Sequence, residues 1–247
     1  MENRIKLITC ADGAAVARTA AELIAAQLLL KPAAVLGLAT GSTPLATYAE
    51  LARRHREDGL SFARARAFNL DEYWGLDGDH PQSYRYFMNR HLFDQVDIRL
   101  WNTCVFDGTA ADAALECEAF ENKILAAGGV DLWLLGIGHN GHIAFNEPGS
   151  PPDSRSRLVE LTPSSIAAAG DGRFFSDPDQ VPRRALTAGV ATIRAARKIV
   201  LLATGSGKAA PVAAALRGPV DPRHPASMLQ GHPDCTFVID EEAAARL

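Results

Sequence analysis

The stretch VDLWLLGIGHNGHIAFNEP, residues 130–148, is the most informative part of the chain. It begins with an apolar run, Val130–Ile137, that has the length and composition of a strand buried on both faces. A glycine-rich turn follows at once with His139 and His142, and Glu147 comes five residues after the second histidine. Strands that are apolar throughout are typical of parallel sheets, where functional residues gather in the turns after the strands. The stretch therefore predicts an α/β protein with a site after this strand.

Short apolar runs alternate with amphipathic stretches on both sides of this strand. We expect further strands over Ile5–Thr9, Ala34–Ala39, Ala65–Leu70, Leu100–Phe106, Lys198–Thr204 and Cys235–Ile239, and helices over Ala14–Leu30, Pro44–Glu57, Ser83–Phe93, Ala110–Ala126 and Ala209–Arg217. This alternation indicates a Rossmann-like α/β fold, a mostly parallel sheet flanked by helices. No linker is visible, so residues 1–247 are predicted to form one domain. Residues 148–182 are rich in Pro, Gly, Ser and Asp with weak periodicity, and we expect them to form a lid segment.

The composition is that of an ordinary globular protein, with 47% hydrophobic and 22% charged residues among 247. These fractions exclude a disordered chain, a fibrous protein and a disulfide-rich miniprotein. The 25 basic and 29 acidic residues give a net charge of −4, which offers no general attraction to nucleic acid or to an anionic membrane. An anionic ligand would therefore need a local positive feature.

The first residues and the cysteines favour the cytoplasm. The chain enters a strand-like run directly, without the charged segment and apolar stretch of a secretory signal. Its longest apolar run, Ala25–Leu30, is too short to span a bilayer. Cys10, Cys104, Cys117 and Cys235 form no CxxC pair, and scattered unpaired cysteines suit a reducing compartment. We therefore expect a cytoplasmic protein with neither a membrane nor a nucleic acid as partner.

Two glycine turns repeat one pattern at distant points in the chain. Leu38–Pro44 reads LATGSTP and Leu202–Lys208 reads LATGSGK, in each case an apolar strand running into a helix. Glycine lets the backbone turn its N–H groups outward, and the positive end of the helix dipole favours an anion there. Thr43 is expected to cap the first helix, and Lys208 adds a full positive charge at the second turn. Ordinary capping would explain either turn alone, but the repetition favours a site for one phosphate group. The second turn lacks the spacing of a triphosphate-binding P-loop.

Acidic and imidazole side chains follow two of the predicted strands. Asp71 stands at the carboxyl end of one, where it could act as a general base or simply cap a turn, and Glu72 should point the other way. His142 and Glu147 are close enough in sequence to converge, and a carboxylate beside a histidine fixes its tautomer and makes it a better proton acceptor. The alternatives are a metal site that includes His139 and a purely structural role for these residues. The absence of an HExxH-type pattern argues against the metal.

Five motifs resemble those of the glucosamine-6-phosphate deaminases in sequence and in order. They are LGLATGSTP at Leu36–Pro44, FNLDEY at Phe68–Tyr73, HPQSY at His80–Tyr84, GHNGHIAFNEP at Gly138–Pro148 and ALTAGV at Ala185–Val190. Together they span nearly the whole chain. The 6-phosphogluconolactonases share the fold and the glycine turns but typically continue differently at Ala144–Pro148, which makes them the second choice. A non-catalytic sugar-phosphate sensor is a third possibility, although residues 1–30 offer no helix-turn-helix.

The resemblance implies the conversion of glucosamine 6-phosphate and water into fructose 6-phosphate and ammonia, a step of amino-sugar catabolism, without a metal or an organic cofactor. His142, supported by Glu147, would assist opening of the sugar ring, and Asp71 would move a proton from C2 to C1. The residues that match the family's catalytic group are Asp71, Asn140, His142 and Glu147. Those that match its phosphate contacts are Thr40, Gly41, Ser42, Thr43, Arg173 and Lys208. The resemblance leaves the amino-sugar epimer open, as well as whether the partner is only the sugar phosphate or also a second copy in a homo-oligomer.

The chain departs from the family pattern at two positions. Many members have Asp where this chain has Asn140, and an amide can orient a neighbour but cannot ionise. We therefore expect Asn140→Asp to shift the pH–rate profile. Allosteric members have a Lys two residues after the Arg that matches Arg157, where this chain has Val159, and they have a tail beyond the position of Leu247. We expect hyperbolic kinetics without activation by N-acetylglucosamine 6-phosphate.

Overall fold

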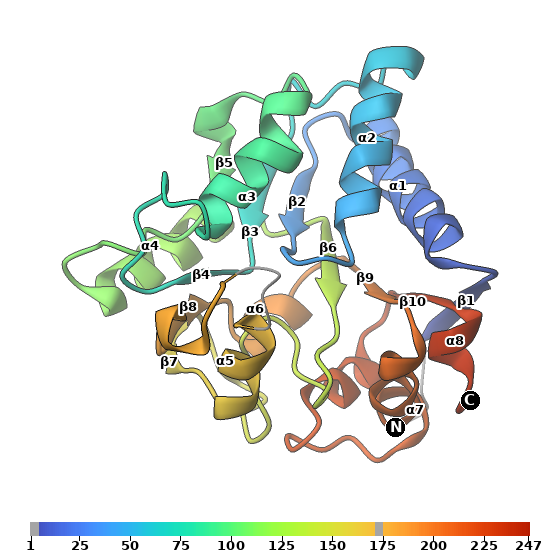
Figure 1. Cartoon of the computed structure of the whole chain (residues 1–247). Coiled ribbons are helices and arrows are strands. Elements are labelled where there is room, and N and C mark those ends of the chain that lie inside the picture. Colours follow the sequence, from blue (N-terminus) through green and yellow to red (C-terminus); the bar gives the residue numbers. More distant parts are fainter. Residues whose placement is uncertain (1–4, 171–174) are drawn as a thin grey trace.

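Seven parallel strands form the main sheet of the computed structural model, which describes residues 5–170 and 175–247 (Figure 1). In spatial order they are β1 (Lys6–Cys10), β10 (Cys235–Asp240), β9 (Lys198–Ala203), β6 (Leu132–Gly136), β2 (Val35–Leu38), β3 (Arg66–Asn69) and β5 (Thr103–Cys104). Every neighbouring pair is parallel. The Rossmann-like α/β fold expected from the sequence is therefore confirmed.

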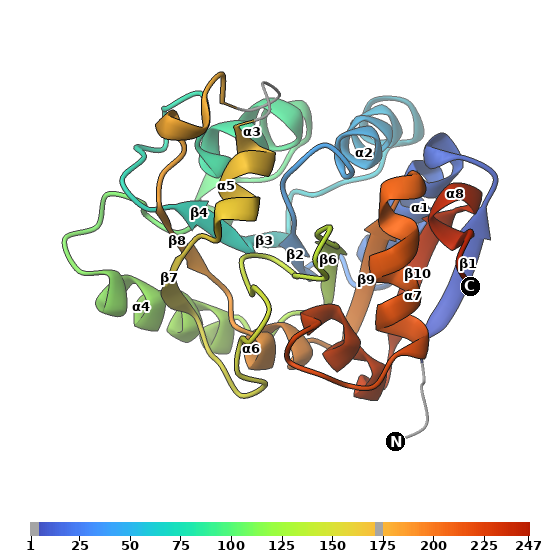
Figure 2. The same ribbon diagram turned by 60° about the horizontal axis from the view of Figure 1, so that its bottom comes forward.

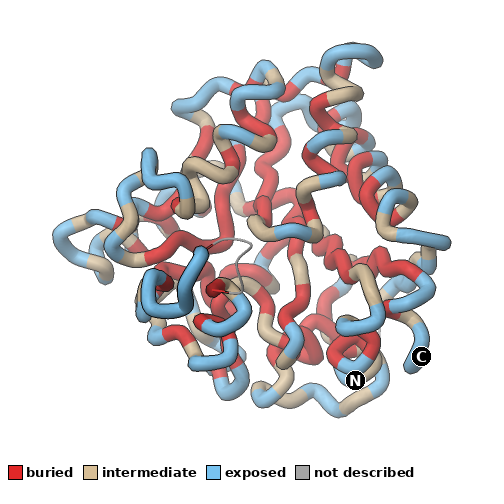
Figure 3. The backbone as a smooth tube through the Cα atoms, in the orientation of Figure 1, coloured by how far each residue is buried: buried red, intermediate tan, exposed pale blue. Residues whose placement is uncertain are grey.

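Helices cover both faces of this sheet. One face packs against α1 (Gly13–Leu30), α2 (Leu45–Asp58) and α3 (Tyr84–His91), and the other against α4 (Ala113–Ala126), α6 (Val190–Arg194), α7 (Ala209–Arg217) and α8 (Glu241–Ala244). Strand β6 shows why its sequence is apolar throughout. Leu132 and Leu134 point into the first layer, and Trp133 and Leu135 into the second. Figure 3 shows the buried backbone concentrated in these strands.

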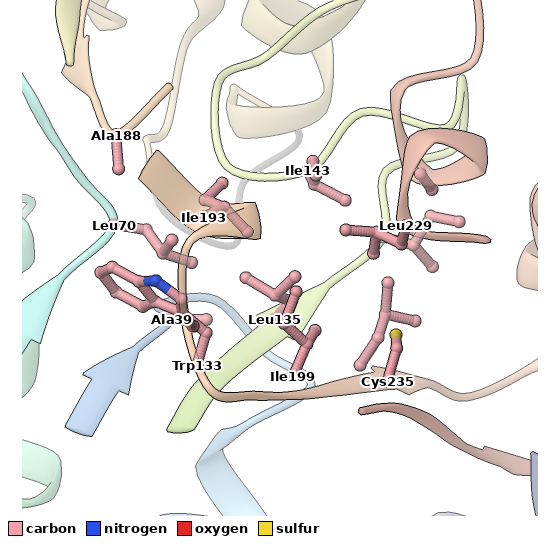
Figure 4. Close-up of a cluster of buried hydrophobic side chains, with 14 of the residues drawn as sticks. Ala39, Leu70, Trp133, Leu135, Ile143, Ala188, Ile193, Ile199, Leu229 and Cys235 are labelled. Carbon is pink, nitrogen blue, oxygen red and sulfur yellow. The ribbon is translucent and has the colours of Figure 1, made fainter. Parts of the chain in front are cut away.

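The layer on the α4 side contains an unusually close contact between two strands. Trp133, which is fully buried, lies across Gly37 of β2, and a Cβ atom built at position 37 would fall 1.5 Å from Cε3 of the indole. In Figure 4, Trp133, Leu135 and Ile199 lie on the side of the sheet where Ile193 of α6 and Leu229 are found. Glycine at position 37 is therefore what allows an indole ring to fill the centre of this layer.

Helix α1 has the length and apolar composition of a membrane span. Seven of its residues are buried, however, and six of these belong to the layer that it shares with α2 and the main sheet: Val16, Ala20, Ala21, Ile24, Ala25 and Leu28. Core helices of globular proteins pass the same test of length and composition. Among the described residues, no other helix passes it.

A second sheet of three antiparallel strands lies beside the main sheet on the side away from β1 (Figures 1 and 2). Its strands are β4 (Asp71–Tyr73), β8 (Arg184–Thr187) and β7 (Arg157–Glu160), with β8 in the centre. Part of the segment 148–182 thus forms β7 and the short helix α5 (Pro163–Ala169), which is more order than its weak periodicity predicts. The remaining elements are five short 3₁₀ helices: Phe93–Gln95, Leu100–Asn102, Pro178–Gln180, Ser206–Lys208 and Pro225–Gly231.

The order of the main strands reverses between β2 and β6. From β2 the chain continues outward to β3 and β5, and from β6 it continues in the opposite direction to β9 and β10. In open parallel sheets such a reversal leaves a crevice at the carboxyl ends of the two strands. The turns after β2 and β6 meet at this crevice.

Candidate active site

A cavity of about 270 Å³ opens at the reversal point. Its lining comes from the ends of four main-sheet strands, from the aromatic side chains of the second sheet and α3, and from α5. The lining includes Thr40, Gly41, Ser42, Thr43, Asp71, Tyr73, Tyr84, His139, His142, Phe145, Ser165 and Lys208. The cavity therefore brings together side chains that are far apart in the sequence.

The turn after β2 forms one end of the cavity. Gly41 has a φ of 112°, in the region that favours glycine. The expected cap by Thr43 is wrong, because Pro44 is the N-cap of α2 and no side chain in the described structure accepts a hydrogen bond from the first turn. The start of a 14-residue helix and the residues Thr40–Thr43 thus face the cavity together. Such an end favours a negatively charged group.

The turn after β9 differs from this arrangement despite its similar sequence. The N–H of Gly205 donates to the Asp240 carboxylate at 2.9 Å, and that of Ser206 donates to Glu242 at 3.1 Å. Since these carboxylates take up both N–H groups, the backbone of this turn faces β10 and α8. Its contribution to the cavity is Lys208, whose Nζ donates to the carbonyl of Ile137 at 2.7 Å. The two turns are therefore alike in sequence but unlike in what they offer a ligand.

Asp71 lies in the cavity wall with only 6% of its surface exposed. Burial raises the pKa of this carboxyl well above its ordinary value, and the charge of Glu72 raises it further. Glu72 points away, as expected, and accepts hydrogen bonds from the backbone N–H groups of Tyr84 and Arg85 and from Ser83 Oγ. A buried carboxylate with a raised pKa is a stronger proton acceptor than an exposed one.

His142 and Glu147 converge, with 3.6 Å between Nδ1 and Oε2. Asn140 links the two, since its Nδ2 donates to Glu147 Oε2 at 2.7 Å and its Oδ1 accepts from the N–H of His142 at 3.2 Å. Burial alone would raise the pKa of Glu147, but His142, Ser165 and Asn140 outweigh it and lower that pKa to about 2. Glu147 is therefore an anion held behind the imidazole. The separation of 3.6 Å is longer than a normal hydrogen bond but within the range of an ion pair.

The backbone at Gly138 packs closely against the His142 ring. A Cβ at Gly138 would lie 2.3–2.5 Å from three atoms of the His142 ring, so the glycine is required for the ring's position. From the opposite side, Thr187 Oγ1 accepts from the N–H of Phe145 at 3.1 Å, and Asn146 Nδ2 donates to the carbonyl of Ala188 at 2.8 Å. The second sheet therefore fixes the loop that follows His142.

Several lining residues were not predicted from the sequence. Tyr73, Tyr84 and Phe145 form an aromatic cluster, with ring centroids 4.9–6.0 Å apart. Burial raises the pKa of Tyr84 well above its ordinary value and that of Tyr73 to about 12, so both phenols stay protonated. The HPQSY motif marks Tyr84, but only the folded chain shows that its ring reaches the cavity. Ser165 of α5 has no sequence signal.

Two further expectations concern Arg173 and a metal site that includes His139. Arg173 lies outside the described residues. Within residues 5–170 and 175–247, no three His, Cys, Asp or Glu side chains lie together as a metal site would require, and His139 and His142 have ring centroids 6.2 Å apart.

Comparison with known proteins shows the family of this chain. Residues 11–238 match the family described as glucosamine-6-phosphate isomerases/6-phosphogluconolactonase. Glucosamine-6-phosphate deaminase 1 of Giardia intestinalis is 51% identical over 97% of this chain and 88% of its own length. The glucosamine-6-phosphate deaminase of Rhodopirellula baltica is 50% identical over 99% and 97%. This chain belongs to the glucosamine-6-phosphate deaminase family.

Solved structures separate the deaminase family from its relatives. A monomeric glucosamine-6-phosphate deaminase superimposes with a TM-score of 0.96 and 41% identity, over 98% of this chain and all of the other. The 6-phosphogluconolactonase of Trypanosoma brucei reaches a TM-score of 0.78 at 24% identity, over 99% of each chain. The second likeness shows the shared fold alone. The resemblance to the deaminases stated from five motifs is thus confirmed.

Proposed function

We propose that this protein is a glucosamine-6-phosphate deaminase, which converts glucosamine 6-phosphate and water into fructose 6-phosphate and ammonia. The observation that supports this best is the placement of Asp71 and the His142–Glu147 pair around one cavity that the turn after β2 and Lys208 also line. An aldose–ketose isomerisation needs a base for ring opening and a second base for proton transfer between carbons, and these two groups come from different strands.

His142 is the group that opens the ring. As general base it takes the proton from the C1 hydroxyl, and it returns that proton to the ring oxygen as the C1–O5 bond breaks. Glu147 behind the ring stabilises the imidazolium that forms in between, and Asn140 holds Glu147 in place at 2.7 Å. The product is the open-chain aldehyde of the amino sugar.

Asp71 then moves a proton along the open chain. Its carboxylate takes the proton from C2 while the ammonium group of the substrate gives a proton to O1, which yields an enolamine with a C1 hydroxyl. The carboxylic acid then returns the first proton to C1, which yields an iminium at C2. Water adds to this iminium, and ammonia leaves as the ketone forms. The raised pKa of Asp71 suits a group that must both accept and return a proton.

The phosphate is assigned to the other end of the cavity. Thr40, Gly41, Ser42 and Thr43 at the start of α2 supply backbone and hydroxyl donors, and Lys208 supplies a positive charge. Arg173 is proposed as a further contact on the basis of the family resemblance. A protein with a net charge of −4 would thus bind an anion through charge gathered at one place.

Release of ammonia from glucosamine 6-phosphate by the purified protein tests the proposal, with galactosamine 6-phosphate as the epimeric substrate and 6-phosphogluconolactone as the control. Asp71→Asn should lower kcat by about 1000-fold or more with little change in substrate binding, because the amide cannot take the C2 proton. If Asp71→Asn keeps near-normal turnover, Asp71 is not the base. If only the lactone is hydrolysed, the protein is a lactonase, and if the sugar phosphate binds without turnover, it is a sensor.

The assembly and location of the protein are part of the same proposal. The relative that superimposes with a TM-score of 0.96 is described as monomeric, and we propose the same state here rather than a homo-oligomer. Light scattering at the concentration of the assay tests this.

A cytoplasmic location is proposed because Cys10, Cys104, Cys117 and Cys235 are all unpaired, which suits a reducing compartment.

A further inference from the structure

Helix α5 brings one hydroxyl to the carboxylate behind His142. Ser165 Oγ donates a short hydrogen bond to Glu147 Oε1, while Glu147 Oε2 accepts from Asn140 and faces His142. Ser165 and Glu147 are each only 8% exposed. The two oxygens of Glu147 are thus divided between two elements, one held by the loop after β6 and the other by α5.

The Ser165 hydroxyl is fixed at its own end as well. Thr162, the N-cap of α5, accepts from the N–H of Ser165 at 3.2 Å, and its Oγ1 donates to Ser165 Oγ at 3.2 Å. With one lone pair of Ser165 Oγ occupied by this donor, the Ser165 proton is directed to Glu147. The next residue of α5, Ile166, packs in the apolar cluster with Phe145 and Phe175. The helix therefore presents Ser165 from a fixed position.

We propose that Ser165 is a positioning residue for ring opening, which holds the Glu147 carboxylate in the rotation that aims Oε2 at His142. This inference rests on the proposed function of the His142–Glu147 pair. The terminal torsion of a glutamate is broad and nearly twofold, so a carboxylate with a single tethered oxygen can swing. Two tethers, from Asn140 and Ser165, define the plane of the carboxylate.

Ser165 also stabilises the charge of Glu147, which gives a readout that does not depend on catalysis. The folded-state pKa of Glu147 is lowered to about 2, with Ser165 among the causes. A lowered carboxyl pKa stabilises the fold above the ordinary carboxyl pKa, and that stability is lost as the pH falls toward 2. Without the Ser165 hydroxyl the pKa is lowered less, so less stability is lost on acidification.

The test compares Ser165→Ala with Ser165→Thr and with the neighbouring control Ser164→Ala. The exposed Ser164 side chain lies outside the cavity lining, and it shares the contact with Thr162 Oγ1, at 3.0 Å, but has no hydrogen bond to Glu147 among those of the described residues. We expect Ser165→Ala to lower kcat by about tenfold, the effect of one hydrogen bond to a charged group, with KM almost unchanged. Ser165→Thr should restore most of kcat, and Ser164→Ala should match the wild type. Affinity for an acyclic amino-alditol 6-phosphate, measured by calorimetry, should be the same in all four proteins because this ligand has no ring to open.

Urea unfolding at about pH 7 and about pH 3 completes the test. Between these two pH values, the free energy of unfolding should fall less for Ser165→Ala than for the wild type or for Ser164→Ala. The proposal is overturned if Ser165→Ala keeps wild-type kcat, if Ser165→Thr fails to restore it, or if the acyclic ligand binds Ser165→Ala more weakly. A wild-type protein without deaminase activity would refute the proposed function instead. The unfolding comparison would still show whether Ser165 stabilises the Glu147 anion.

Discussion

Position 140 holds an amide, and the structure shows what that amide does. Asn140 Nδ2 lies 2.7 Å from Glu147 Oε2 as a donor. In Asn140→Asp the donor becomes a second carboxylate at the same distance, and the repulsion raises the pKa of Glu147 from about 2. Glu147 is then protonated at higher pH than in the wild type, so we expect the acidic limb of kcat/KM to move to higher pH.

The measurement is the pH dependence of kcat/KM for the wild type, Asn140→Asp and Asn140→Ala. The alanine variant removes the donor without adding charge, and its acidic limb should move less than that of the aspartate variant. An identical profile for all three proteins would mean that position 140 does not tune the pair.

Gly138 determines where the His142 ring can lie. Since a Cβ there would come within 2.3 Å of the ring, Gly138→Ala must displace the imidazole by about 1 Å. Misplacement of a catalytic group on this scale costs about 100-fold in rate. We expect kcat to fall by that factor while the thermal unfolding temperature changes little, as measured by steady-state kinetics and circular dichroism. A variant with normal kcat would show that the ring has another productive position.

At the scale of elements, Glu72 joins β4 to the start of α3. Its carboxylate is 1% exposed and accepts from the N–H groups of Tyr73, Tyr84 and Arg85 at 2.8–3.0 Å, and from Ser83 Oγ at 2.8 Å. Glu72→Ala leaves these donors buried without an acceptor. We expect the free energy of unfolding to fall by about 3 kcal/mol in urea titrations.

Glu72→Gln is the matched control, because its amide oxygen still accepts some of these bonds, and it should lose less stability than the alanine variant. Equal stability of wild type and Glu72→Ala would show that water satisfies the start of α3. Since Tyr84 of α3 reaches the cavity, the alanine variant should also have a raised KM.

The elements also show how far sequence reasoning extends. The central strands could be predicted because each is an unbroken apolar run. In Leu132–Leu135, for example, alternate side chains pack into the two layers, so every residue is apolar. The second sheet could not, because β4 has three residues and is a strand only through pairing with β8, far along the chain. Asp71 and His142 could be placed in one crevice because the carboxyl ends of parallel strands converge.

Ser165 and Tyr84 could not be placed in that crevice from the sequence. They come from helices whose positions depend on the second sheet and on Glu72. The turn after β9 differs from expectation for a related reason. Asp240 and Glu242, which accept hydrogen bonds from its N–H groups, come much later in the chain, so the sequence of the turn itself does not reveal them.

At the scale of the whole molecule, we expect the rate to depend hyperbolically on substrate concentration. Arg157 turns inward, where it donates to Asn146 Oδ1 at 2.9 Å and to Ser150 Oγ at 3.1 Å. Val159, which departs from the pattern expected of allosteric members, packs against the apolar cluster of the second sheet. Initial rates with and without N-acetylglucosamine 6-phosphate test this. A sigmoidal curve that the added sugar phosphate makes hyperbolic would contradict it.

The contact between Gly37 and Trp133 limits which sequences can share this fold. No side chain fits at position 37 while the indole lies across β2, since the first added carbon would overlap the ring. Conversely, a smaller residue at position 133 would leave a hole the size of an indole in the centre of the sheet. We therefore expect the two positions to be coupled in evolution. An alignment of close relatives should show glycine at position 37 wherever an aromatic ring occupies position 133.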